Sequence, residues 1–395
     1  MKRILFSALA TLVVIVSAAA QNDAATATAT DSASVSASAS VSASASVDGR
    51  KSPNDWHLLA GADFDVLFDN REYAGCEFGE SQTLFSSRLT PVVGVGWGGD
   101  KNRLMFGMDL RSDFGNKTDV FADIRPQVYY RFDNRRAAAY AGIFPRERML
   151  GDYGELFVSD SMSFYENLVQ GVMGQYRGDR GYVELSIDWC GMYSEASREK
   201  FRIMSAGRLW FDRPKRFYGG YNFSMLHYAG SEQIAGCVVD HIMIDPYIGA
   251  AFKAWFDFDI SLHYVQSLQH DRSNERSFRK PKGGMLRFRM SKWGIFIDEQ
   301  LYMGEDLMPF YSSYRSERFP DGYGGDFYAC ETFFGTTKHI YNNLKLGYDR
   351  RFFDDTLGVK CYIAMQYDGT AWGTKQMVQV SVRLLKDIPL YRKKN

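Results

Sequence analysis

The sequence has 395 residues and no net charge, with 47 Lys and Arg against 47 Asp and Glu, and 15% of its residues are aromatic. A nucleic-acid-binding chain concentrates basic residues and a disordered chain is poor in aromatic ones, so the composition argues against both classes. The five cysteines form no CxxC pair, so we expect neither a zinc ribbon nor a thioredoxin-like site.

The first twenty residues predict that the chain is exported from the cytoplasm. Lys2 and Arg3 precede an apolar run at 4–16, and three alanines end at Ala20. This pattern is typical of a cleaved secretory signal peptide over residues 1–20, whereas a membrane anchor would need a longer apolar run of about 20 residues. Residues 21–53 are rich in Ala, Ser, Thr and Val and contain no aromatic residue, so we expect a disordered leader there.

From Trp56 onward, apolar and polar residues alternate with the period of a β-strand. Between Arg103 and Asp113 one face carries apolar residues and the other carries most of the charges; the apolar face consists of Leu104, Phe106, Met108 and Leu110. The same alternation recurs near 120–132, 183–189, 258–264 and 378–384. Many runs reach about 10 to 14 residues, which suits a tilted strand that crosses a membrane.

The connections between these runs alternate in length, as in an outer-membrane barrel. Short turn signals lie at Gly98–Asn102, Asp133–Arg136, Gly178–Gly181 and Asp354–Asp355, and longer polar stretches lie at Asp69–Gln82, Leu150–Ser163, Gln269–Gly283 and Gly304–Gly325. Tyr and Trp residues near many run ends suit an interfacial girdle. We therefore predict an all-β fold: one antiparallel transmembrane barrel of about 16 strands (range 14–18) over 54–387, followed by a tail at 388–395.

Other architectures fit less well. After the predicted signal peptide no run of 18 or more apolar residues remains, which argues against membrane-spanning helices. The sequence contains no repeat of fixed length, which argues against a propeller. A β-sandwich also alternates, but its strands are shorter than these runs.

Residues 142–201 contain the segments GIFPRERML, FYENLVQG, ELSIDWCG and SREKF. Together with the leader and the aromatic-rich runs, they resemble outer-membrane barrel proteins of the Bacteroidota type, a porin-like group of undetermined function. The resemblance implies a Gram-negative outer membrane as the location, with its lipid, lipopolysaccharide and barrel-assembly machinery as partners. One departure is the C-terminus, which is Asn395 rather than an aromatic residue; assembly would then use an internal signal or Tyr391.

Charged residues on the predicted inward faces are the candidate site. They are expected to line the pore or form its constriction, where opposed charges focus the electric field. The alternative is a structural network of ion pairs between strands. The candidates are Arg103, Asp109, Arg111, Asp123, Arg125, Arg146, Arg148, Glu184, Asp188, Asp298 and Arg383.

No catalytic or metal-binding motif stands out. Asp240 adjoins His241 and His270 adjoins Asp271, but neighbours along a strand point to opposite faces. No GxSxG elbow is present, and no His, Cys or Asp cluster has the spacing of metal ligands. We therefore expect no enzyme, no catalytic residue, no metal and no cofactor.

These observations favour porin-like passage of small polar solutes across the outer membrane. The alternative is a structural or interaction barrel with a plugged lumen, whose long loops bind a surface partner or a polysaccharide. A membrane-embedded hydrolase is the third hypothesis. No nucleic acid is expected as a partner, and the solute, the oligomeric state, the open or closed lumen and any disulfide pairing are left open.

Overall fold

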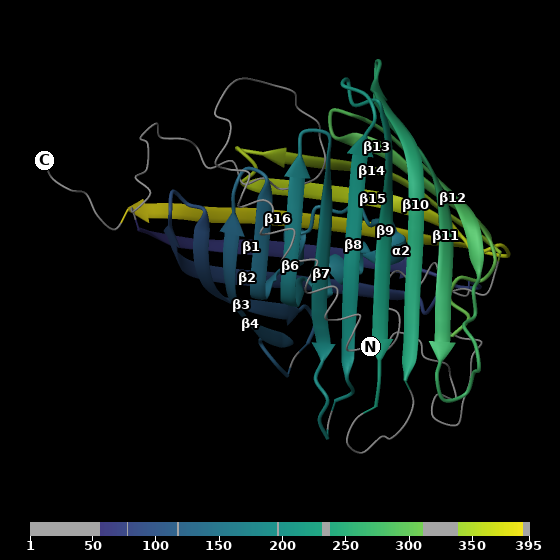
Figure 1. Ribbon diagram of the computed structural model, residues 1–395, viewed down its shortest axis with the longest axis horizontal. Helices are drawn as coiled ribbons and strands as arrows, with labels where there is room; N and C mark the ends of the chain where they lie inside the picture. The colour runs from purple at the N-terminus through teal and green to yellow at the C-terminus, as the bar shows by residue number, and fades with distance from the viewer. Residues whose placement is uncertain are drawn as a thin grey trace, which may run out of the picture.

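The computed structural model describes residues 56–389, except 77, 117, 196, 231–237 and 311–338. In this part of the chain, sixteen antiparallel strands close into one barrel in which β1 pairs with β16 (Figure 1). They are β1 (His57–Glu72), β2 (Gln82–Trp97), β3 (Asn102–Asp113), β4 (Asp123–Asp133), β5 (Ala137–Pro145), β6 (Leu168–Gly178), β7 (Gly181–Gly191), β8 (Lys200–Trp210), β9 (Phe217–Tyr228), β10 (Val239–Lys253), β11 (Asp257–Asp271), β12 (Lys282–Lys292), β13 (Ile295–Gly304), β14 (Ile340–Phe352), β15 (Leu357–Tyr367) and β16 (Trp372–Pro389).

The predicted antiparallel barrel of about 16 strands is thus confirmed. The predicted signal peptide, the leader and residues 390–395 of the predicted tail lie outside the described residues. The described helices include none that is long and apolar enough to cross a membrane.

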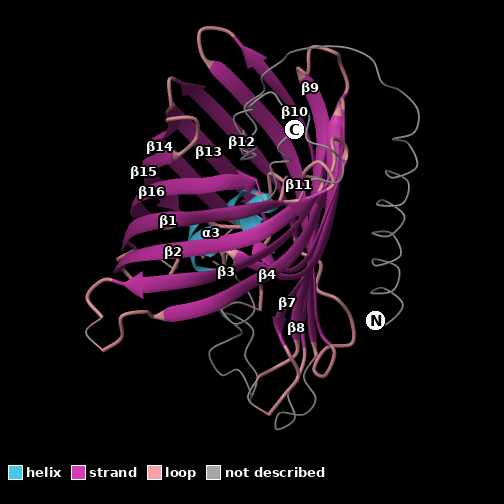
Figure 2. Cartoon of the chain, turned by 90° about the vertical axis from the view of Figure 1, so that its left-hand side faces the viewer, coloured by secondary structure: helices cyan, strands magenta, loops and turns pink. Residues whose placement is uncertain are grey.

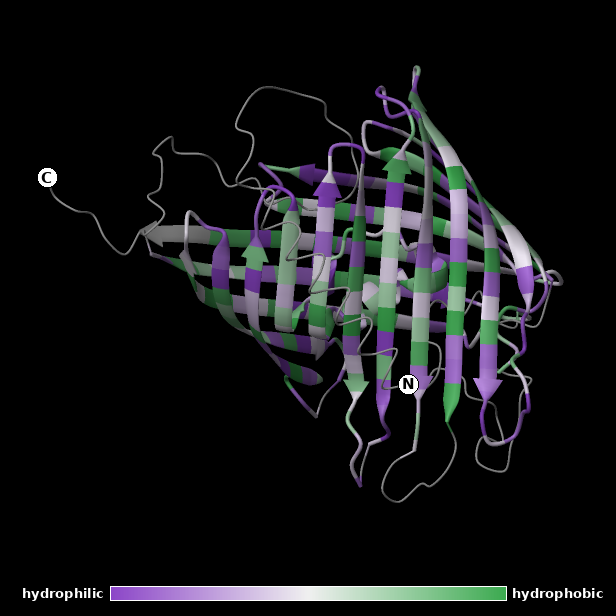
Figure 3. Ribbon diagram, viewed as in Figure 1, coloured by the Kyte–Doolittle hydropathy of each residue, from purple (hydrophilic) through white to green (hydrophobic). Residues whose placement is uncertain are grey.

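Alternation separates the two faces of the wall. On β3, Phe106 and Met108 are each 43% exposed on the outer face, whereas Met105 and Asp109, which flank this pair, are buried on the inner face. Successive side chains of a strand point to opposite faces, so one period-two pattern serves both environments. Figure 3 shows the resulting alternation of hydrophobic and hydrophilic positions along the strands.

Short turns gather at one rim of the barrel and longer connections at the other. The short-turn rim carries the turns after β2, β4, β6, β8, β10, β12 and β14, together with the start of β1 and the end of β16. After β12, Trp293 and Gly294 have φ of 56° and 92°, a left-handed pair that suits a two-residue hairpin turn. At the long-loop rim, β1 continues to Glu72 and β11 to Asp271, so two of the predicted loops begin later than expected.

The connection between β5 and β6 folds into the barrel instead of standing on the rim (Figure 2). This inward segment, residues 146–167, contains a 3-10 turn η1 (Arg146–Arg148) and two short helices, α2 (Gly154–Phe157) and α3 (Asp160–Tyr165). Ser159 caps α3, since its hydroxyl accepts a hydrogen bond from the Met162 amide at 3.0 Å.

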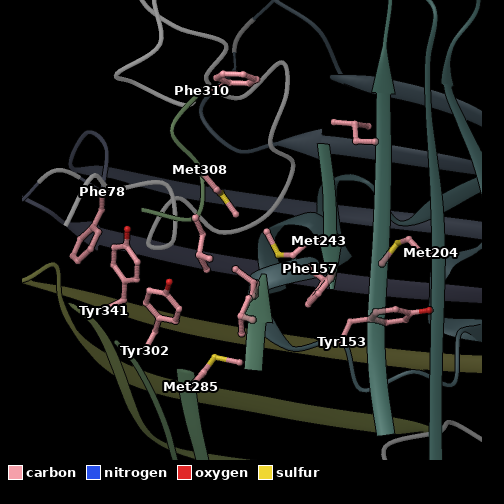
Figure 4. Packing of buried hydrophobic residues seen from close by; sticks show 14 of the residues in the cluster. Phe78, Tyr153, Phe157, Met204, Met243, Met285, Tyr302, Met308, Phe310 and Tyr341 are labelled. Atoms are coloured by element: carbon pink, nitrogen blue, oxygen red, sulfur yellow. The ribbon is translucent and has the colours of Figure 1, made fainter. Parts of the chain in front are cut away.

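The inward segment occupies space that the sequence analysis assigned to a pore. Tyr153, Leu156 and Phe157 pack against buried apolar side chains that line strands β8 to β14 (Figure 4). These wall residues include Met204, Leu226, Met243, Val265, Met285, Tyr302 and Tyr341. The predicted rim loop at Leu150–Ser163 is therefore part of the interior, because its apolar residues find a matching apolar wall there.

The outer face of β4 offers a test of membrane contact. Val128, near the middle of the strand, is 45% exposed. Val128→Arg should lower the free energy of unfolding by about 2–4 kcal/mol, because arginine at this depth meets hydrocarbon. Val120→Arg, in the loop before β4 where the side chain is 77% exposed, should change it little. Urea titration in lipid vesicles measures both, and equal effects would contradict a lipid-facing Val128.

Candidate functional site

Ion pairs attach the inward segment to the far wall of the barrel. Lys345 on β14 contacts Glu155 of α2 and lies 3.2 Å from Asp160 of α3. Lys360 and the Tyr362 hydroxyl on β15 each donate to Asp160 at 2.7 Å. Burial alone would raise the pKa of the Asp160 carboxyl, but Lys360 and Lys345 hold it well below its usual range.

The opposite end of the segment is attached to β7. Arg146 lies 2.6 Å from Asp188 and donates from Nε to the Glu166 carbonyl at 2.7 Å. Glu184 accepts the backbone amides of Leu150 and Gly151, both at 2.7 Å. Charged groups of the wall therefore satisfy backbone groups that the segment would otherwise leave unpaired inside the barrel.

A third attachment lies between these two. Asp152 lies 3.1 Å from both Arg208 on β8 and Arg287 on β12. Burial would raise the pKa of Asp152, yet the two guanidinium groups hold it well below its usual range. The attachment therefore persists at any pH above the ordinary aspartate value of about 3.9.

The eleven residues predicted for the pore lie on inward-facing wall positions or on the inward segment. Asp109 accepts from Asn167 at 2.6 Å, and Arg125 donates to the Tyr165 carbonyl at 2.7 Å. The remaining pairs are Arg103 with Asp100, Arg111 with Asp113, Asp123 with Arg125, Arg148 with Glu147, Asp298 with Arg289, and Arg383 with Asp65. Their role in a pore stays a prediction.

One polar cavity of about 220 Å³ lies beside the inward segment. Its wall comes mainly from β1, β2, β14, β15 and β16, and Glu147 and Asn167 of the segment close it on the other side. Both signs of charge line it, with Asp63, Arg88 and Lys360 among the residues. Removing charged groups from water costs free energy unless they keep polar partners. A cavity with this lining therefore suits water or a polar solute.

Inside the barrel, a serine, a histidine and an aspartate form a relay. The Ser261 hydroxyl lies 2.8 Å from His263 Nε2, and His263 Nδ1 lies 2.8 Å from Asp245 Oδ1. All three side chains are buried, and Asn222 donates to the second Asp245 oxygen at 3.0 Å. This is the order of groups found in serine hydrolases. We call it the inner relay.

A second histidine pairs with an aspartate on the outer face of the wall. His227 Nδ1 lies 2.8 Å from Asp240 Oδ1, and Arg272 donates to the other Asp240 oxygen at 2.6 Å. The register pairs His227 with Asp240 across β9 and β10, while the next residue, His241, points inward to Ser267 at 3.0 Å. We call His227 and Asp240 the outer dyad.

The outer dyad lies at the long-loop end of an apolar strip. The His227 ring packs on Phe201 in a tilted arrangement with ring centroids 4.9 Å apart, and Phe201 stacks on Trp189 at 5.1 Å. Toward the short-turn rim, the next outward positions of the same strands are Ile187, Ile203, Met225 and Ile242. Both side chains of the dyad are buried, with 1% of His227 and 2% of Asp240 exposed.

The sequence analysis missed both arrangements for the same reason. It compared histidines only with their neighbours along the strand, whereas the partners are two residues away or across the sheet. Ser261 and His263 share one face of a predicted strand, and this spacing was a usable signal. The cross-strand partners Asp245 and Asp240 depend on register, which the sequence alone does not provide.

The described residues provide little basis for a metal site or a disulfide. Within the described ranges, no group of three His, Cys, Asp or Glu side chains is placed to hold a metal ion. Cys76, Cys190 and Cys361 carry free thiols, whereas Cys237 and Cys330 lie outside the described residues.

A closed antiparallel barrel with an apolar outer face and a charged interior is the architecture of an outer-membrane protein. A model of the lipid A 3′-O-deacylase-type family matches residues 58–384, and the chain belongs to this family. The expectation that the protein is not an enzyme is therefore wrong, because the family is an enzyme family. The sequence analysis did not anticipate this, because the strand register brings His and Asp side chains together without a local motif in the sequence.

Comparison with solved structures finds other barrels. They include the outer-membrane protein OpdK of Pseudomonas aeruginosa (10% identity, 83% of this chain and 99% of that chain, TM-score 0.44) and OprD of the same organism (10%, 84% and 95%, 0.44). A triple mutant of the Rhodopseudomonas blastica porin is similar at 12% identity, with 82% and 99% of the two chains covered and a TM-score of 0.40. No curated protein matches the sequence.

Removing the cation between α2 and α3 tests how the segment is held. Lys345→Met should leave Glu155 and Asp160 without their shared partner and destabilise the docked segment by about 3–5 kcal/mol. Lys253→Met, at an exposed pair with Asp257, should cost about 0–1 kcal/mol. Hydrogen exchange of residues 146–167 measures the difference, and unchanged protection in Lys345→Met would refute this attachment.

Proposed function

We propose that the protein hydrolyses an acyl ester of a lipid A-type glycolipid in the outer membrane, with the outer dyad as its catalytic centre. The observation that carries this proposal is the 2.8 Å contact between His227 and Asp240, two buried side chains on the outward side of β9 and β10. The family to which the chain belongs supports the class of reaction. The apolar strip below the dyad supports a substrate with acyl chains.

The chemistry follows from the hydrogen bond. Asp240 accepts from Nδ1–H of His227, so the proton from water goes to Nε2, an atom of a buried side chain. The resulting hydroxide attacks the ester carbonyl, and the tetrahedral intermediate breaks its bond to the alkoxy oxygen. Protonated His227 then gives its proton to the departing glycolipid oxygen, and a fatty acid is released. Asp240 stabilises the imidazolium in between, while Arg272 fixes the carboxylate.

The inner relay suits this substrate less well, although its geometry is closer to a complete triad. A membrane lipid would have to pass its ester through a wall whose strands are all paired with their neighbours. Opening a strand pair in hydrocarbon leaves backbone groups without partners, at a cost of several kcal/mol for each group. The position of the outer dyad requires no such opening.

His227→Gln should lower the rate of fatty-acid release from lipid A by about 10²- to 10⁴-fold, the usual contribution of a general base. Asp240→Asn should also lower the rate, since it no longer stabilises the charged imidazole. Ser261→Ala is the matched control inside the barrel and should leave the rate unchanged. Mass spectrometry of lipid A after incubation with purified protein measures the products. A loss in Ser261→Ala with normal turnover in His227→Gln would assign the reaction to the inner relay instead.

Passage of small polar solutes is a second candidate, favoured by the polar cavity of about 220 Å³ beside the inward segment. Its lining of Asp63, Arg88 and Lys360 matches the mixed charge expected for a weakly selective path. The inward segment narrows the route, because its apolar side packs against β8 to β14 and leaves only the side facing β1 and β14 to β16.

Planar-bilayer recordings test this second function. The folded protein should give small, stable current steps, and Lys360→Glu should shift the reversal potential toward cation selectivity. Lys253→Glu, at the exposed end of β10, is the matched charge change away from the cavity and should produce no shift. Folded protein that never conducts would rule out the path.

A further inference from the structure

The outer face of the barrel carries a groove near the short-turn rim, far from the outer dyad. Its volume is about 420 Å³, within the range of about 300–1,000 Å³ typical of small-molecule sites. It runs across β6, β7, β8 and β9, and Tyr176, Val183, Leu209 and Tyr221 supply its side chains. These are outward positions, because the residues beside them, Gln175, Glu184, Arg208 and Asn222, make their contacts inside the barrel.

Glycines create the groove. The register aligns Tyr176, Val183, Gly207 and Tyr221 in one row across the four strands. The adjacent row toward the short-turn rim is Gly178, Gly181, Leu209 and Gly219. Four of these eight outward positions are glycine, which leaves a recess beside Tyr176 and Tyr221, while the rings of Tyr221 and Phe211 lean over Gly207 and Gly219. An outward position in a membrane barrel normally carries an apolar side chain.

The turns below the groove carry a net positive charge, with four basic residues against Asp179 and Asp212. Arg180 lines the groove and lies in the turn after β6, while Arg213, Lys215 and Arg216 lie in the turn after β8. The two turns are adjacent, since the Trp210 amide donates to the Arg180 carbonyl at 2.7 Å. Arg216 pairs with Asp212 at 3.3 Å, and the described residues offer Arg180 and Arg213 no ion-pair partner. Two exposed guanidinium groups are thus available directly below an apolar recess.

The depth of the groove separates it from the proposed catalytic centre. Gly219 lies eight residues before His227 on β9, which is about 26 Å along the strand at about 3.3 Å per residue. At a tilt of about 40° this is about 20 Å of depth, most of the apolar band of about 25 Å. The groove therefore faces the leaflet at the short-turn rim, and the dyad faces the other leaflet.

We propose that this groove binds one anionic phospholipid from the leaflet at the short-turn rim. An acyl chain occupies the recess beside Tyr176 and Tyr221, and the phosphate-containing headgroup pairs with Arg180 and Arg213. Arginine binds phosphate through paired N–H donors, which gives the site a preference for anionic headgroups. The charge of the turns favours this occupant over a second copy of the barrel, whose own turns there carry the same basic residues. The site does not depend on the proposed hydrolysis.

Native mass spectrometry of the full-length protein, extracted from vesicles of phosphatidylglycerol and phosphatidylcholine in equal amounts, tests the proposal. One phosphatidylglycerol should remain bound per barrel, at least tenfold in excess over phosphatidylcholine. Val183→Trp and Leu209→Trp, which fill the recess, should each lower its retention at least tenfold. Arg180→Gln combined with Arg213→Gln should remove the preference for phosphatidylglycerol. Val128→Trp, on the outer face of β4, is the matched control and should retain the lipid.

Heat-modified gel mobility confirms that each variant is a folded barrel before lipid is counted. Equal retention of the two lipids by the unchanged protein, or full retention by both tryptophan variants, would overturn the proposal. A barrel dimer that both tryptophan variants dissociate would overturn it in favour of contact between copies.

Discussion

Pairing of every strand with two neighbours around a closed ring is the constraint on which this structure depends. Because β1 pairs with β16, the backbone has no free edge, and the wall can lie in hydrocarbon without unpaired groups. Closure also fixes which side chains face which solvent. Adjacent residues therefore serve different environments: Asp240 faces outward with His227, and His241 faces inward with Ser267.

The interior shows how a wide barrel is filled without a conventional core. A barrel of sixteen strands is too wide for wall side chains alone to meet at its centre. Here residues 146–167 supply the missing layer, with an apolar side against β8 to β14 and acidic groups that pair with Lys345, Arg208 and Arg287. The arrangement places most of the predicted lumen charges in ion pairs and leaves a polar cavity beside the segment.

The sequence predicts the wall well and the interior poorly, for physical reasons. Period-two alternation and turn signals such as Gly98–Asn102 are local, so strand number and barrel closure could be anticipated. The inward fold of 146–167 depends on contacts with strands about 200 residues away or more, such as Lys360 with Asp160 and Arg383 with Glu147. The same holds for both histidine arrangements and for the recess at Gly207, since cross-strand register decides which residues meet.

The account's central claim is that the outer dyad lies on the outward side of the wall, while its neighbours along β9 face the interior. Single spin labels at successive positions 221–227, read by collision with oxygen and with a water-soluble nickel complex, test it most directly. The account predicts that positions 221, 223, 225 and 227 are accessible to oxygen, and that positions 222, 224 and 226 between them are shielded from it. Oxygen accessibility that does not alternate, or a label at 227 that follows the inward positions, would contradict the assignment and remove the basis for hydrolysis at this face.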